Sequence, residues 1–188
     1  MYNKKPLYGF GVNDSDYVVQ PSVNGTRKIC PFYRTWQDML KRTCSEKYKI
    51  KNPTYHGSSV CPDWLVFSVF RAWMVDQDWK GKQLDKDILI EGNKCYSPET
   101  CVFVDARTNS FMSTSGKSTN TGLPGVSLRK NGVYAVQCDG KTVGNFRCIN
   151  EAKNAYITQK ALVAKELASQ QSDERVKYAI IERFVKEI

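Results

Sequence analysis

The sequence predicts an α+β protein of two domains, and three observations support this fold class. Residues 84–88 alternate apolar and charged side chains with the period of two that a β-strand requires. Apolar side chains recur at helical spacing in four stretches, two in each half of the chain. Between them, Asn131-Gly132 and Asp139-Gly140 separate three short strand-like runs, and both dipeptides favour hairpin turns.

Length and charge restrict the class of protein. A chain of 188 residues accommodates one ordinary domain or two small ones. Its 41% hydrophobic content supports modest cores, and its 12% aromatic content argues against disorder. A net charge of +9 indicates a polyanionic partner, with nucleic acid favoured over a membrane surface. The alternative on charge alone is a basic protein that binds no polyanion.

The chain lacks the patterns that mark export or membrane insertion. No apolar run has the length of a membrane span, and residues 1–10 lack the apolar centre of a signal peptide. We therefore expect a cytoplasmic protein whose seven cysteines are reduced thiols. No CxxC pair occurs, so buried free thiols are favoured over a structural Zn²⁺ site at Cys44, Cys61, Cys95 and Cys101.

The first half predicts two helices after an irregular or hairpin-like lead-in over residues 1–31. One helix carries apolar side chains at Tyr33, Trp36, Met39 and Leu40, followed by two basic residues. The other begins at Pro62, a residue favoured at the first helical position. Its apolar row, which we expect in the core, consists of Trp64, Phe67, Phe70, Ala72 and Trp73.

Residues 83–109 carry the candidate metal ligands. On the predicted strand, Asp85 and Asp87 share one face, while Leu84, Lys86 and Ile88 share the other. A polar turn at 91–93 leads to a second apolar run at 101–104, and the returning segment ends at Asn109. Asp85, Asp87 and Asn109 supply oxygen ligands, which suit Mg²⁺ or Mn²⁺.

This segment resembles the HNH nucleases of phages and mobile elements. The resemblance rests on the order of four short strings, Leu84-Asp85-Lys86-Asp87, Gly92-Asn93, Tyr96-Ser97-Pro98-Glu99 and Thr100-Cys101-Val102-Phe103. It implies a ββα-metal fold with supporting helices over residues 1–112, and metal-dependent cleavage of DNA. Asp85 stands at the position of the family's general-base His, and Thr100 at that of its middle Asn. The catalytic candidates are thus Asp85, Asp87 and Thr100.

The single histidine of the chain does not match the catalytic position of that family. His56 precedes the motif in a polar stretch and is expected to be a surface residue. Activation of water would then fall to Asp85 or Asp87, or to hydroxide on the metal. A protein that has lost this chemistry and only binds DNA is the alternative, and so is a solvated strand face at the two aspartates.

The second half predicts a small three-stranded antiparallel sheet followed by two helices. Residues 113–121 have almost no apolar side chains and are predicted to be a linker. The expected strands are Gly125–Arg129, Val133–Cys138 and Lys141–Phe146. A helix from about Asn150 carries Ala152, Ala155, Tyr156, Leu162 and Val163 near one face, and the 172–188 helix carries the stripe Val176, Ile180, Phe184 and Ile188. That stripe must meet this chain, a second copy or a protein partner.

Residues 122–167 resemble the plant ethylene-response-factor (APETALA-two) DNA-binding domain. The matching residues are Gly125-Val126, Tyr134-Ala135-Val136, Gly144 with Phe146, Glu151-Ala152 and Ala155-Tyr156. In that family the sheet enters the major groove of double-stranded DNA. The resemblance therefore implies a DNA-binding domain at 122–188, fused in a phage protein of the bacterial cytoplasm to the nuclease-like domain.

The residues expected to contact DNA lie on the predicted sheet. Arg129 and Gln137 can bind base edges bidentately, whereas Lys130 and Lys141 are placed near turns for phosphates. Ser127 and Tyr134 complete the candidate face. Residues 123–165 carry seven basic and two acidic side chains, so over half of the net charge lies in this segment. The alternatives are a solvated polar sheet face and a protein-binding antagonist that uses the last helix.

Overall fold

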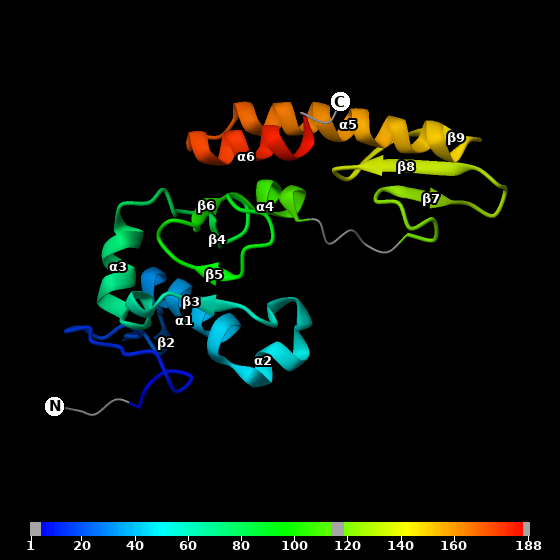
Figure 1. Ribbon diagram of the computed structural model, residues 1–188. Helices are drawn as coiled ribbons and strands as arrows, with labels where there is room; N and C mark the ends of the chain where they lie inside the picture. Colours follow the sequence, from blue (N-terminus) through cyan, green and yellow to red (C-terminus); the bar gives the residue numbers. More distant parts are fainter. Residues whose placement is uncertain (1–4, 114–118, 186–188) are drawn as a thin grey trace. The chain divides into compact units, whose positions relative to one another are not determined.

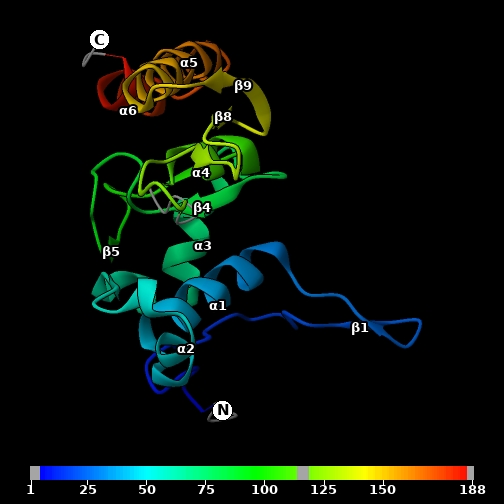
Figure 2. The same cartoon turned by 90° about the vertical axis from the view of Figure 1, so that its right-hand side faces the viewer.

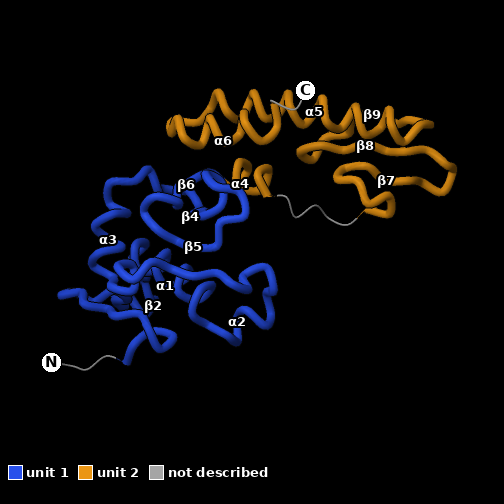
Figure 3. Tube along the Cα trace, viewed as in Figure 1, with its two compact units in different colours: residues 1–105 blue, residues 106–188 orange. Residues whose placement is uncertain are grey.

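The computed structural model describes residues 5–113 and 119–185 and has a mixed α+β fold (Figure 1). The chain divides into two compact units, Met1–Asp105 and Ala106–Ile188 (Figure 3). The division falls ahead of the expected domain boundary at residue 112, because the helix at 106–112 packs with the second unit.

The first unit is built from short elements. Its strands are β1 (Ser22–Val23), β2 (Thr26–Arg27), β3 (Ser59–Val60), β4 (Gln83–Asp85), β5 (Cys95–Tyr96) and β6 (Val102–Val104). Its helices are α1 (Pro31–Cys44), α2 (Glu46–Lys51) and α3 (Phe67–Val75), with 3₁₀ turns η1 (Pro53–Tyr55) and η2 (Pro62–Leu65). The β1–β2 hairpin projects from the unit (Figure 2) and agrees with the expected lead-in.

An aromatic core holds this unit together, as the spacing of the aromatic residues predicts. Trp36, Trp64 and Phe67 are fully buried, and the Trp36 indole N–H donates to the Trp64 carbonyl at 2.7 Å. A buried indole needs such a partner because an unsatisfied N–H costs free energy in an apolar environment. The α1 residues Tyr33, Met39 and Leu40 are buried beside them.

The helix expected from Pro62 onward is divided into two, η2 and α3, and the sequence did not indicate this division. Val66 has extended backbone angles between η2 and α3. Val12 pairs alongside it, donating its N–H to the Leu65 carbonyl at 2.8 Å and accepting from the Phe67 N–H at 3.0 Å. These two bonds satisfy backbone groups that a continuous helix would use internally. Ala72, expected in the apolar row, is exposed on α3.

The strand expected over residues 84–88 ends at Asp85. Its first residues pair antiparallel with β6, with Leu84 opposite Phe103. The Asp85 carboxylate then accepts the backbone N–H groups of Asp87 and Ile88, at 2.8 and 2.9 Å. This side-chain turn replaces the strand ladder, so Asp85 and Asp87 do not share a strand face.

The second unit contains one antiparallel sheet and three α-helices in its described part. These elements are α4 (Ala106–Met112), β7 (Val126–Leu128), β8 (Tyr134–Cys138), β9 (Lys141–Phe146), α5 (Ile149–Ser169) and α6 (Glu174–Phe184). The sheet order is β7-β8-β9, and the three strands match the predicted ones closely. Asp139 and Gly140 both have positive φ, at 50° and 74°, as a tight two-residue hairpin turn requires.

Helix α5 packs against both the sheet and α6 of this unit. Its first half covers one face of the sheet, and its second half lies alongside α6 (Figure 1). It begins after Cys148 with no side-chain cap, not at an Asn150 cap, and Leu162 is 55% exposed instead of buried. The stripe on α6 meets this chain, because Val176 and Ile180 are buried against α5. Ile188 lies outside the described residues.

Helix α4 packs against α5 and α6 through Phe111. The rings of Phe111 and Phe184 contact edge to face at 5.0 Å. The Lys160 ammonium lies 3.6 Å from the Phe111 ring centroid and donates to the Phe111 carbonyl at 2.9 Å. These contacts explain why the division precedes α4.

Part of the expected linker belongs to the sheet unit. Asn120 exchanges two hydrogen bonds with the backbone of Leu128, and Thr121 donates to the Val126 carbonyl. Residues 119–121 are therefore fixed beside β7, whereas residues 114–118 lie outside the described part of the chain. None of the helices in the described ranges has both the length and the hydrophobicity of a membrane span.

Candidate functional site

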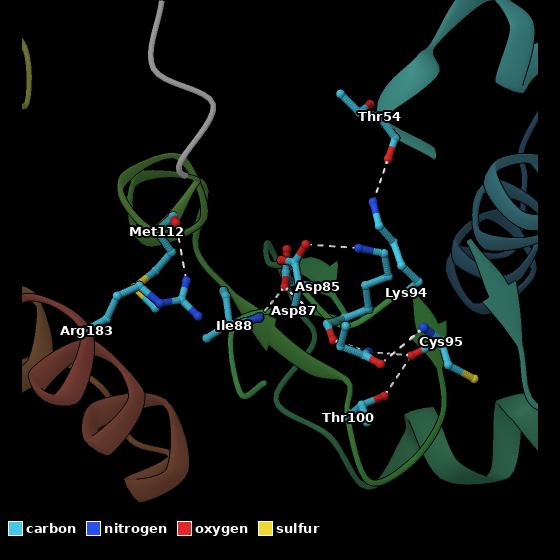
Figure 4. Close-up of polar contacts among 11 residues, drawn as sticks. Thr54, Asp85, Asp87, Ile88, Lys94, Cys95, Thr100, Met112 and Arg183 are labelled. Carbon is cyan, nitrogen blue, oxygen red and sulfur yellow. Dashed lines mark hydrogen bonds and ion pairs between the residues drawn. The ribbon is translucent and has the colours of Figure 1, made fainter. Parts of the chain in front are cut away.

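The first candidate site is the carboxylate turn, defined as Asp85, Lys86 and Asp87 (Figure 4). The Lys86 ammonium donates to Asp87 at 2.9 Å and lies 5.9 Å from the centroid of the Tyr96 ring. Lys86 is only 7% exposed, so this ion pair compensates a charge that burial alone would strongly disfavour. The two carboxyl groups lie within hydrogen-bonding reach of each other.

Burial is the main cause of a raised pKa at Asp85. It raises the pKa of Asp85 above its ordinary value, and the neighbouring Asp87 carboxylate raises that pKa further. The two backbone N–H donors act in the opposite direction but do not cancel the effect. Asp85 is therefore a better proton acceptor at neutral pH than an ordinary aspartate.

A hydrogen-bonded loop holds the turn in place. The Asn93 amide donates to the carbonyls of Lys86 and Cys95 at 2.6 and 2.7 Å. The Thr100 hydroxyl donates to the Cys95 carbonyl at 2.9 Å (Figure 4). It also lies 3.1 Å from the Ser97 hydroxyl. Thr100 thus closes this loop, and its expected catalytic role stays a prediction.

The fit of a divalent cation depends on the carboxylate oxygens of this turn. One Asp85 oxygen accepts two N–H groups, and one Asp87 oxygen accepts the Lys86 ammonium. Mg²⁺ is held in many sites by one or two carboxylates, with water and phosphate as its other ligands. A cation would also relieve the repulsion that raises the Asp85 pKa, so the pair fits such an ion.

Other expected site residues lie elsewhere. Asn109, an expected metal ligand, lies in the middle of α4. It belongs to the second unit, whereas the carboxylate turn belongs to the first. His56 is exposed at the end of η1. Across residues 5–113 and 119–185, no cluster of three or more His, Cys, Asp or Glu side chains could hold a metal, and all seven cysteines are free thiols.

The second candidate site is the outer face of the sheet, meaning the face that α5 does not cover. Residues directly opposite in neighbouring strands share a face. The register places Ser127, Ala135 and Asn145 in one row and Gln137 opposite Thr142 in the next. Arg129 follows Ser127 on the same side. Apart from Ala135, these side chains are exposed.

Tyr134 is not part of this outer face. It lies opposite Leu128 and Phe146, on the side that packs against α5, with Val126 and Val136. The period of two requires this, because Tyr134 and Val136 are two residues apart on β8. The remaining expected contacts, Ser127, Arg129 and Gln137, share the outer face.

Basic side chains border the outer face. Lys130 lies in the first hairpin turn, Lys141 begins β9, and Arg147 follows β9; all three are exposed. The acidic residue of the second turn, Asp139, accepts two hydrogen bonds from Arg107, at 2.8 and 3.1 Å. That pair neutralises Asp139, so the border of the face is electropositive.

Three site residues were missed from the sequence. Asn145 and Thr142 extend the outer face, and strand pairing across the Asp139-Gly140 turn could have located them. Asn93 stands in the Gly92-Asn93 string, but its role as a loop bridge depends on contacts that no local pattern specifies. Comparison with protein-family models, with curated proteins and with solved structures finds no match for this chain.

Proposed function

We propose that this protein binds double-stranded DNA through the outer face of its β7–β9 sheet. The observation that carries the proposal is an exposed polar face, with Arg129 and Gln137 on one side of the sheet, bordered by lysines and an arginine. Two antiparallel strands fit the major groove of B-form DNA. This is also the binding mode that the ethylene-response-factor resemblance implies.

The outer face offers both kinds of contact that recognition needs. Arg129 presents the two donors that match guanine, and Gln137 presents the donor and acceptor that match adenine. Lys130, Lys141 and Arg147 supply the sequence-independent attraction to phosphates. The neutral Ala135 at the centre leaves space for strands to approach base edges closely.

Substitution of Arg129 tests the proposal. Arg129→Ala should weaken binding to a selected target duplex by about 1–3 kcal/mol and relax base preference at one position. Lys141→Ala should weaken binding to all sequences alike. Arg175→Ala on α6 removes the same charge away from the sheet and is the control. Equal binding by all three variants and the wild type would contradict the proposal.

Metal-dependent cleavage of DNA is a second candidate function, and the carboxylate turn is the observation that favours it. Asp85 and Asp87 would hold a Mg²⁺ or Mn²⁺ ion, which supplies positive charge to the scissile phosphate. Asp85 or Asp87 would accept a proton from water as the general base. Lys86 holds Asp87 in position through their ion pair.

Cleavage is tested on a supercoiled plasmid with magnesium and with manganese. Asp85→Asn keeps an oxygen for the two backbone N–H groups but removes the charge, so it should abolish nicking and leave DNA binding intact. His56→Ala should change nicking little. If the wild type binds DNA but nicks no plasmid with either metal, the proposal of DNA cleavage is rejected and the proposal of DNA binding is retained.

A further inference from the structure

A second strongly basic surface lies on the first unit, far in sequence from the sheet. We call it the α2 patch and define it as residues 41–56 together with Lys94. Residues 41–56 contain five lysine or arginine residues and one acidic residue, Glu46. Lys94 joins them through a hydrogen bond from its ammonium to the Thr54 carbonyl at 3.2 Å (Figure 4).

Aromatic rings hold part of this charge in place. Tyr48 and Tyr55 lie with their ring centroids 5.7 Å apart. The Lys41 ammonium lies 4.7 Å from the Tyr48 centroid, and the Arg42 guanidinium carbon 5.6 Å from the Tyr55 centroid. Arg42 also hydrogen-bonds Tyr96, which anchors it to the loop of the carboxylate turn. Cations fixed in this way lose less side-chain entropy when they bind an anion.

The remaining lysines are poorly neutralised. Glu46 is paired with Lys49 at 3.1 Å, which leaves Lys47 and Lys51 exposed one helical turn apart on α2. Like charges at this spacing destabilise a helix. A merely solvated helix face would gain from alternating charges, whereas a surface that binds a polyanion needs this excess.

We propose that the α2 patch binds the phosphate backbone of duplex DNA without reading its sequence, in addition to the contact that the sheet makes. The inference rests on the proposed DNA-binding function. Cations already cover ring faces of Tyr48 and Tyr55, and these rings also lie against each other, so phosphate contact is favoured over base stacking. Since Arg42 and Lys86 both contact Tyr96, the patch adjoins the carboxylate turn within the first unit.

The test measures binding of the full chain to a random-sequence DNA duplex over a range of salt concentrations. Replacing Lys47 and Lys51 by Gln should lower the slope of log affinity against log salt by about 2 and weaken binding by about 10- to 100-fold at 0.1 M salt. The thermal stability should not fall, because the change removes a like-charge pair.

The matched control replaces Lys28 and Lys80 by Gln. Both are exposed lysines of the same unit, and they follow β2 and α3, which lie apart from α2 (Figures 1 and 2). Equal slopes for the patch and control variants would overturn the inference, and if Arg129→Ala still weakens binding, the proposed function survives. A patch effect on duplex RNA alone would also overturn it. Salt-insensitive or absent DNA binding by the wild type would instead remove the proposed function itself.

Discussion

Asp85 combines a turn-forming role with a charge that the fold disfavours. One of its oxygens organises the backbone at Asp87 and Ile88, and burial raises its pKa. A carboxyl group whose pKa is raised by burial and by a neighbouring carboxylate is a candidate for function, because functional sites are where such shifts gather.

The pH dependence of stability provides a test of this account. A raised folded pKa means that the native state binds the Asp85 proton more tightly than the unfolded state. Its stabilising contribution is present below the ordinary value of 3.8 and is lost as the pH rises through the folded pKa. Asp85→Asn should therefore melt at a higher temperature than the wild type at pH 7.

This advantage should shrink as the pH falls towards 3.8, where the wild-type carboxyl is protonated. Mg²⁺ should raise the melting temperature of the wild type and not that of Asp85→Asn. Thermal unfolding followed by circular dichroism at several pH values measures both effects. A lower melting temperature of Asp85→Asn at pH 7 would show that the carboxylate is stabilising and contradict the assignment.

At the scale of elements, the sheet and helix of the second unit meet at Gly125. Its φ is +68°, and a Cβ there would lie 2.3 Å from the Tyr156 ring and 2.4 Å from the Gln137 carbonyl oxygen. The Gly125 carbonyl accepts the Gln137 N–H at 2.8 Å, next to the bulge between Val136 and Gln137. Gly125 thus positions Gln137 on the outer face.

Alanine substitutions separate the two effects at this glycine. Gly125→Ala should destabilise the second unit by about 3 kcal/mol or more, because the left-handed backbone and the clash both oppose it. Gly140→Ala shares the positive φ but has nothing within 4 Å, so it should cost about 1–2 kcal/mol. Denaturant unfolding measures the free energy of unfolding of both variants. An equal loss in the two variants would show that the close approach of Gly125 to Tyr156 does not contribute to stability.

The elements that the sequence predicted well are those with strong local patterns. The β8–β9 hairpin follows from Asp139-Gly140, and α1 follows from the spacing of Trp36 and its neighbours. The failures involve contacts that hydrophobic periodicity does not encode. The Asp85 carboxylate accepts two nearby backbone N–H groups and ends the strand. The backbone of Val12, from a distant part of the sequence, pairs beside Val66 and interrupts the helix.

The candidate sites show the same limit. Alternation predicted that Ser127 and Arg129 lie on one side of the first strand. The expected face also included Gln137 and Tyr134, but these two residues are three positions apart on β8, and Tyr134 lies on the opposite face, with Val136. The α2 patch depends on the approach of Lys94 to Thr54, which are forty positions apart in the chain. The charge of residues 41–56 was visible in the sequence, but its arrangement around two rings was not.

At the scale of the whole molecule, two compact units each carry a basic surface. The outer face of the sheet belongs to the second unit, and the α2 patch and the carboxylate turn belong to the first. We propose that the second unit contacts both base edges and phosphates, and that the α2 patch of the first unit adds phosphate contacts only. Removing charge from the patch should therefore change affinity while leaving base preference unaltered.

NMR mapping of the ¹⁵N-labelled full chain during titration with a DNA duplex locates the residues that bind DNA. We predict that the largest amide shifts in the second unit cluster on the outer face, at Ser127, Arg129, Gln137 and Asn145. Residues of α5 and α6 that face away from the sheet should shift little. Shifts concentrated on α5 and α6, or no shifts in β7–β9 at low salt, would contradict this prediction.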